Sequence, residues 1–98
     1  MTYKIWYFER DVSTGDLVSI AAVIDFQGRK KLILRDTRDL LTGPQFGLVR
    51  HAYKHLFWNP RVNLSNESDL FVASELLECP PVEDPAEWIR GVLHSDRA

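Results

Sequence analysis

Two histidines, His51 and His55, stand four residues apart in a segment whose apolar residues recur at helical spacing. This spacing places both imidazoles on one face of a helix, as in helical zinc sites. A complete zinc site needs a third and usually a fourth ligand, and the glutamate of the His-Glu-x-x-His pattern is absent. Lys54 adds a positive charge beside the pair, which repels a cation. We therefore expect no metal here and assign both histidines to the protein surface.

Basic and aromatic side chains follow one edge of the same expected helix. Arg50 and Lys54 are also four residues apart, and Trp58 and Arg61 continue the series. Guanidinium and ammonium groups can hold phosphates, and an indole ring can stack on a base. The edge formed by Arg50, Lys54, Trp58 and Arg61 is therefore a candidate nucleic-acid-binding site. Basic pairs at this spacing are common on helix surfaces, so the pattern on its own favours an ordinary surface or a contact with protein.

Carboxylates are numerous in the first forty residues, and Asp25 is the most notable because it lies in a strongly apolar segment. Paired acids can bind Mg²⁺ or exchange protons, which makes a small metal-dependent hydrolase or nuclease one hypothesis. Such a nuclease needs two or three acids that converge with a lysine, and the sequence does not supply that set. Ion pairs with Arg35 and Arg38 are better-supported roles for these carboxylates.

No nucleophile in the sequence has the surroundings that catalysis requires. None of the serines stands in a Gly-x-Ser-x-Gly elbow, and the isolated glycines form no phosphate-binding loop. Cys79, the only cysteine, precedes Pro80 and Pro81 rather than a helix start that would activate its thiol. A single cysteine also excludes an intramolecular disulfide and a cysteine-based zinc cage. We predict no catalytic residue and no cofactor, and we lean toward a non-enzymatic protein.

The composition is that of an ordinary globular domain. The 98 residues are 45% hydrophobic and 27% charged, with a formal net charge of −2. Negative net charge argues against strong nonspecific attraction to a phosphate backbone, although it allows a local basic patch. No apolar run approaches the length of a membrane span, and the N-terminus lacks the pattern of a signal peptide. We expect one cytoplasmic domain that covers residues 1–98 and has no membrane partner.

Three strands are expected in the first third of the chain, at residues 3–10, 17–26 and 30–35. Gly15 and the Gln27-Gly28 pair separate them and suit hairpin turns. The sequence thus predicts an antiparallel meander with residues 17–26 in its centre. Alternate residues of this central strand form a wholly apolar face, consisting of Val18, Ile20, Ala22, Ile24 and Phe26.

Two helices have clear signals. Thr42 and Pro44 suit the start of the first helix, and Asn59-Pro60 ends it. Asp84-Pro85 begins the last helix, which has an apolar side around Ile89. The apolar half of the first helix contains seven residues, namely Phe46, Leu48, Val49, Ala52, Tyr53, Leu56 and Phe57.

The segment 70–78 fits two structures. Its apolar residues cluster on one side of a helical wheel, but its position between turn-forming segments also suits a fourth strand. We expect a helix, which gives the order βββααα, and the strand gives the alternative βββαβα. Either order is an α+β fold in which a three-stranded antiparallel β-meander packs with two or three α-helices.

The expected sheet has more apolar surface than one layer of helices would cover. Exposed apolar patches usually mark interaction surfaces, unless residues 65–79 cover this one within the chain. The leading hypothesis is therefore a small protein-binding or regulatory module that contacts a protein partner, or a second copy in a homodimer. The alternative is a nucleic-acid-binding regulator that uses the basic edge of the first helix. The patch expected to bind protein consists of Trp6, Phe8, Leu17, Ala21 and Val23.

Overall fold

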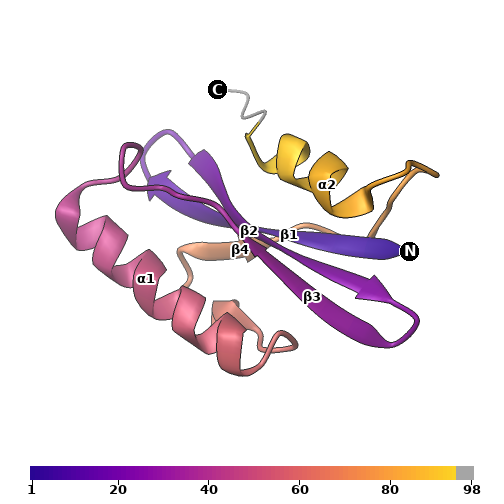
Figure 1. Cartoon of the computed structure of the whole chain (residues 1–98). Coiled ribbons are helices and arrows are strands. Elements are labelled where there is room, and N and C mark those ends of the chain that lie inside the picture. The colour runs from indigo at the N-terminus through magenta and orange to yellow at the C-terminus, as the bar shows by residue number, and fades with distance from the viewer. Residues whose placement is uncertain (95–98) are drawn as a thin grey trace.

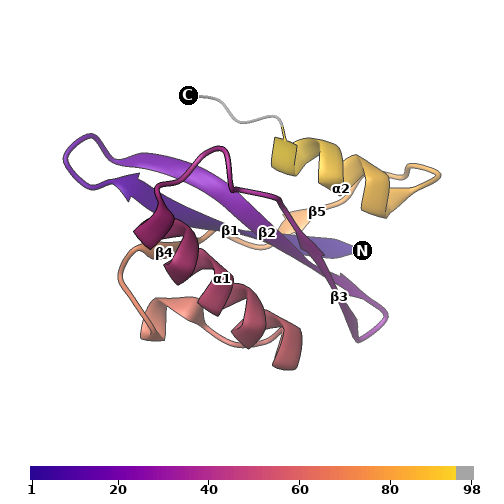
Figure 2. The same cartoon turned by 60° about the vertical axis from the view of Figure 1, so that its left-hand side comes forward.

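The computed structural model describes residues 1–94 and has three layers, in which an antiparallel sheet lies between two helices (Figure 1, Figure 2). The α+β class is thus as predicted. Among the described residues, no helix is long and apolar enough to cross a membrane. The elements in chain order are β1 (Thr2–Asp11), β2 (Asp16–Phe26), β3 (Arg29–Leu34), α1 (Gly43–Trp58), the short 3-10 helix η1 (Leu64–Asn66), β4 (Phe71–Ala73), β5 (Leu77–Glu78) and α2 (Pro85–His94).

The first three strands form the predicted meander, with β2 between β1 and β3. The turn between β2 and β3 places Gln27 and Gly28 at φ values of 53° and 81°. Positive φ at both central residues is the geometry of a type I′ turn, whose twist matches that of the strands it joins. The tight connection predicted at Gln27-Gly28 is therefore confirmed.

The prediction of a helix over residues 70–78 is wrong. The strand alternative is right in kind, but the segment forms two short strands, β4 and β5, which both pair with the open edge of β1. Ser74 joins them: its N–H donates to the Ile5 carbonyl at 2.8 Å, and its hydroxyl accepts from the Ile5 N–H at 2.9 Å. The unpaired backbone groups of β1 therefore determine the structure of this segment.

A β-bulge in β2 decides which residues face which helix. Trp6 of β1 pairs with Ala21, whereas the next residue, Tyr7, pairs with Ser19, so Ile20 is an extra residue in β2. Ile20 and Ala21 consequently both join the cluster beneath α1. The alternation of residues between the two sheet faces, which was predicted along this strand, is interrupted at Ile20. The residues of the predicted apolar face therefore lie on both sides of the sheet.

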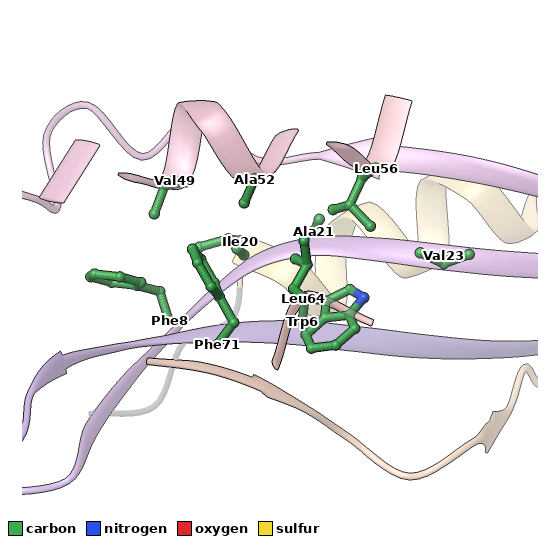
Figure 3. Close-up of a cluster of buried hydrophobic side chains, with 10 residues drawn as sticks. All are labelled: Trp6, Phe8, Ile20, Ala21, Val23, Val49, Ala52, Leu56, Leu64 and Phe71. Carbon is green, nitrogen blue, oxygen red and sulfur yellow. The ribbon is translucent and has the colours of Figure 1, made fainter. Parts of the chain in front are cut away.

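Within residues 1–94, two hydrophobic clusters, one on each side of the sheet, form the core. Each sheet face is therefore covered by residues of the same chain. The cluster beneath α2 contains Tyr3, Ile5, Ala22, Ile24, Ile33, Ile89 and Leu93. The cluster beneath α1, which Figure 3 shows, contains Trp6, Phe8, Ile20, Ala21, Val23, Val49, Ala52, Leu56, Leu64 and Phe71.

The start of α1 matches the prediction. Thr42 is the N-cap and forms a reciprocal capping box with Gln45. The buried stripe is narrower than the predicted apolar half, because only Val49, Ala52 and Leu56 are buried. Phe57 lies about 100° further round the helix than Leu56 and consequently faces solvent.

Candidate binding surface at the end of the first helix

The five residues expected to contact a protein partner do not form an exposed patch. Trp6, Phe8, Ala21 and Val23 are buried beneath α1 (Figure 3), and only Leu17, at 39%, retains substantial exposure. The reason is that α1, η1 and β4 cover this face of the sheet with Leu56, Leu64, Phe71 and neighbouring side chains. A homodimer through this face would require α1 to leave the sheet.

The most exposed large apolar side chains of the described residues lie instead at the end of α1. Trp58 is 83% exposed and Phe57 is 72% exposed. Their rings meet edge to face, with centroids 5.9 Å apart and an interplanar angle of 83°. We call this pair the aromatic tip. Both rings lie mainly in solvent rather than in the core.

The sequence-predicted basic edge adjoins the aromatic tip. Arg50, Lys54 and Trp58 are exposed and recur at four-residue intervals along α1, and Arg61 follows in the loop after the helix. None of the ion pairs within residues 1–94 involves the side chain of Arg50, Lys54 or Arg61. Arg50, Lys54 and Trp58 thus share one side of α1, as their spacing predicted, and among the described residues no carboxylate lies within ion-pair distance of the three basic side chains.

A pocket of about 240 Å³ opens beside this edge, where Arg61 approaches the sheet. Its charged lining consists of Lys4, Lys30 and Arg61 against one carboxylate, that of Asp25, so positive charge predominates. The apolar part of its lining consists of Val23, Pro60 and Leu76. We call it the basic pocket.

Asp25 forms an ion pair near the turn of the β2–β3 hairpin, and it is not part of a group of converging catalytic acids. The Lys30 ammonium lies 2.7 Å from its Oδ2, and the Gly28 N–H donates to its Oδ1 at 3.2 Å. The hydrogen bond from Lys30 lowers the pKa of Asp25, with smaller contributions from the Gly28 N–H and the positive charge of Arg61. A carboxylate with a lowered pKa stays ionised at neutral pH and is a poor proton exchanger there.

Further acids of the first forty residues also form local pairs. Arg38 holds Asp36 at 2.6 Å, as predicted, and this hydrogen bond lowers the pKa of Asp36 to about 2. Asp16 pairs with Arg10 at the other hairpin. Within residues 1–94, no three or more His, Cys, Asp or Glu side chains gather in an arrangement that could hold a metal ion.

His51 and His55 lie on the surface of α1, and their rings are in contact. Their Nε2 atoms are 3.0 Å apart, and the ring centroids are 4.6 Å apart at 78°. On its other side, His55 Nδ1 lies 3.8 Å from Oε1 of Glu67. Helical spacing predicted the shared face, but the sequence contained no signal for Glu67.

Sequence reasoning missed the basic pocket because its walls come from distant segments. A signal existed for part of it, because a two-residue turn at Gln27-Gly28 places Asp25 opposite Lys30. Nothing local indicates that Leu76 would line the same pocket as Arg61, because the position of Leu76 depends on the path of the chain between β4 and β5.

The chain matches no known family model, and searches of curated proteins and of solved structures also found no match. The chemistry of the surface therefore carries the functional inference.

Proposed function

We propose that this chain is a non-enzymatic protein-binding module whose contact surface is the aromatic tip of α1 together with the basic pocket. The observation that carries the proposal is the exposure of two adjacent large aromatic side chains, Phe57 and Trp58. Aromatic residues are enriched in the cores of protein interfaces, and a few buried side chains, often Trp, Tyr or Arg, carry most of the binding energy.

Rigidity supports the assignment. Both rings lie on the last turn of α1. Leu56, the residue before them in the same turn, is fully buried in the core. The Asn59 N–H donates to the His55 carbonyl at 2.9 Å and closes the helix end. Binding through a fixed helix end loses little conformational entropy, which favours affinity.

Charge indicates the kind of partner. Lys54 and Arg61 flank the aromatic tip, and neither forms an ion pair with a described residue. The neighbouring basic pocket has room for an acidic side chain between Lys4, Lys30 and Arg61. Complementary charge increases the association rate and excludes wrong partners. The partner is therefore a protein with an apolar cavity bordered by acidic residues.

Site-specific photo-cross-linking tests the proposal. Phe57 is replaced by the photoreactive aromatic p-benzoylphenylalanine, and the protein is irradiated in a lysate of its source cells. We expect a cross-linked protein whose formation is abolished by Trp58→Ser or Arg61→Glu. The control carries the same group at Val12, which is also highly exposed, at 69%, but lies in the hairpin between β1 and β2. Identical products from positions 57 and 12 would contradict the proposal.

The periodic basic edge favours a second candidate, a regulator that binds single-stranded nucleic acid. Arg50 and Lys54 would contact phosphates while a base stacks on Trp58. Fluorescence anisotropy with a labelled single-stranded oligonucleotide tests it at low salt. Binding that weakens in Lys54→Ala and falls with added salt would support this candidate. Absence of binding at low salt would exclude it.

A further inference from the structure

The contact between His51 and His55 lies outside both core clusters. Both side chains lie on the solvent side of α1, one helical turn apart, and nothing in the core holds their Nε2 atoms at 3.0 Å. At this distance the two nitrogens can share only one proton, because a second would place two N–H groups against each other. One Nε2–H therefore points toward the lone pair of the other Nε2.

The separation fits a metal ion in place of that proton. With metal–nitrogen bonds of about 2.0–2.1 Å, two nitrogens 3.0 Å apart subtend an angle of about 91–97° at the metal. This angle is close to the 90° between neighbouring ligands of a square-planar site, the geometry that Cu²⁺ and Ni²⁺ prefer. Neighbouring ligands of a tetrahedral zinc site subtend a wider angle at the metal, so the nitrogen separation fits zinc less well.

Glu67 supplies a second feature of metal-binding histidines. When Nε2 binds a metal, Nδ1 carries the proton and commonly donates it to a carboxylate. In this structure Nδ1 of His55 lies 3.8 Å from Oε1 of Glu67. A small rotation of the exposed Glu67 side chain would close this distance to a hydrogen bond, which would fix the ring with its Nε2 lone pair outward.

The geometry points to a chelate site for a divalent transition metal, in which His51 and His55 bind Cu²⁺ through Nε2 and Glu67 orients His55. The site is open, because the protein supplies two ligands and water completes the coordination. It does not depend on the proposed protein-binding function. The preference follows the general affinity order for divalent metals, with Cu²⁺ above Ni²⁺ and Zn²⁺. The sequence-based expectation of no metal rested on the missing further ligands and on the positive charge of Lys54, and it did not include this nitrogen separation.

Calorimetric titration of the full chain with Cu²⁺ tests the site. We expect one Cu²⁺ per chain, an affinity at least tenfold weaker in His51→Gln and in His55→Gln, and an unchanged affinity in His94→Gln. His94 is a matched control because it is exposed on α2, and its Nδ1 lies 2.8 Å from the Arg90 carbonyl. Glu67→Gln should weaken binding less than either histidine variant does.

Fluorescence gives an independent readout, because Cu²⁺ quenches nearby indoles and Trp58 follows His55 by three residues. We expect Cu²⁺ to quench the wild-type protein, and we expect most of this quenching to be lost in Trp58→Phe although calorimetry still detects binding. The proposal would be overturned by absence of one-to-one binding. It would also be overturned if His51→Gln and His55→Gln bound Cu²⁺ as tightly as the wild type.

Discussion

Trp58 and Phe57 meet edge to face in solvent, with ring centroids 5.9 Å apart, one residue beyond the fully buried Leu56. The last turn of α1 thus changes from core to surface within three consecutive residues. Leu56 holds the helix on the sheet, whereas the aromatic tip contributes little to that packing. Stability and binding should therefore depend on different residues of the same turn.

Substitutions in this turn should separate the two roles. Leu56→Ala should lower the free energy of unfolding by about 2–5 kcal/mol, because it leaves a cavity beneath α1. Trp58→Ser should change it by less than about 0.5 kcal/mol, because the ring is exposed. Urea denaturation followed by circular dichroism measures both. Equal losses in the two variants would show that Trp58 belongs to the core.

The ion pair in the basic pocket gives a prediction about pH. Lys30→Met should raise the pKa of Asp25 toward its ordinary value, because the Lys30 hydrogen bond is the largest cause of its lowering. Arg61→Met should raise it less. Because the folded-state pKa is below the unfolded one, the stabilisation is present at neutral pH and is lost as the pH falls through the lowered pKa.

Carboxyl-carbon NMR titration of Asp25 measures these shifts directly. Asp36 is the internal reference, since its partner Arg38 is unchanged and its pKa should stay at about 2 in every variant. A pKa of Asp25 that is the same in Lys30→Met as in the wild type would contradict the assigned cause.

Ser19 connects α2 to the sheet, and its loss should be costly. Its buried hydroxyl donates to the Leu93 carbonyl at 2.7 Å and accepts from the Arg35 guanidinium at 2.9 Å. Ser19→Ala should destabilise the protein by about 1–3 kcal/mol, because buried polar groups lose a partner. Amide exchange of α2 should accelerate more than that of α1. Thr14→Ala, in the exposed hairpin turn, is the control, and an equal effect there would contradict this role.

The parts of the fold that were predictable from sequence are those with local causes. Gly15 and Gln27-Gly28 determine where the chain turns, and Thr42 and Asp84 begin the helices through their own side chains. The segment 70–78 was assigned incorrectly because its pairing partner is β1, more than sixty residues away in the chain. A helical wheel contains no information about such an edge.

The interior of the central strand was only partly predictable. The bulge at Ile20 interrupts the alternation of residues between the two faces of the sheet. Because Ile20 and Ala21 are both apolar, the sequence pattern does not reveal this interruption. The apolar side chains that suggested an open sheet face are buried in the two clusters beneath α1 and α2. By contrast, the exposure of Arg50, Lys54 and Trp58 was predictable, since a helix that buries Val49, Ala52 and Leu56 must present those positions to solvent.

The affinity of the cross-linked partner for defined variants tests the central claim most directly. Trp58→Ala should weaken the complex by at least about thirtyfold, the loss expected for an aromatic residue at the centre of an interface. Val12→Ala, at a similarly exposed apolar position outside the surface, should change the affinity less than about twofold. Binding that Trp58→Ala leaves intact, or that Val12→Ala weakens equally, would contradict the assignment of the aromatic tip as the contact surface.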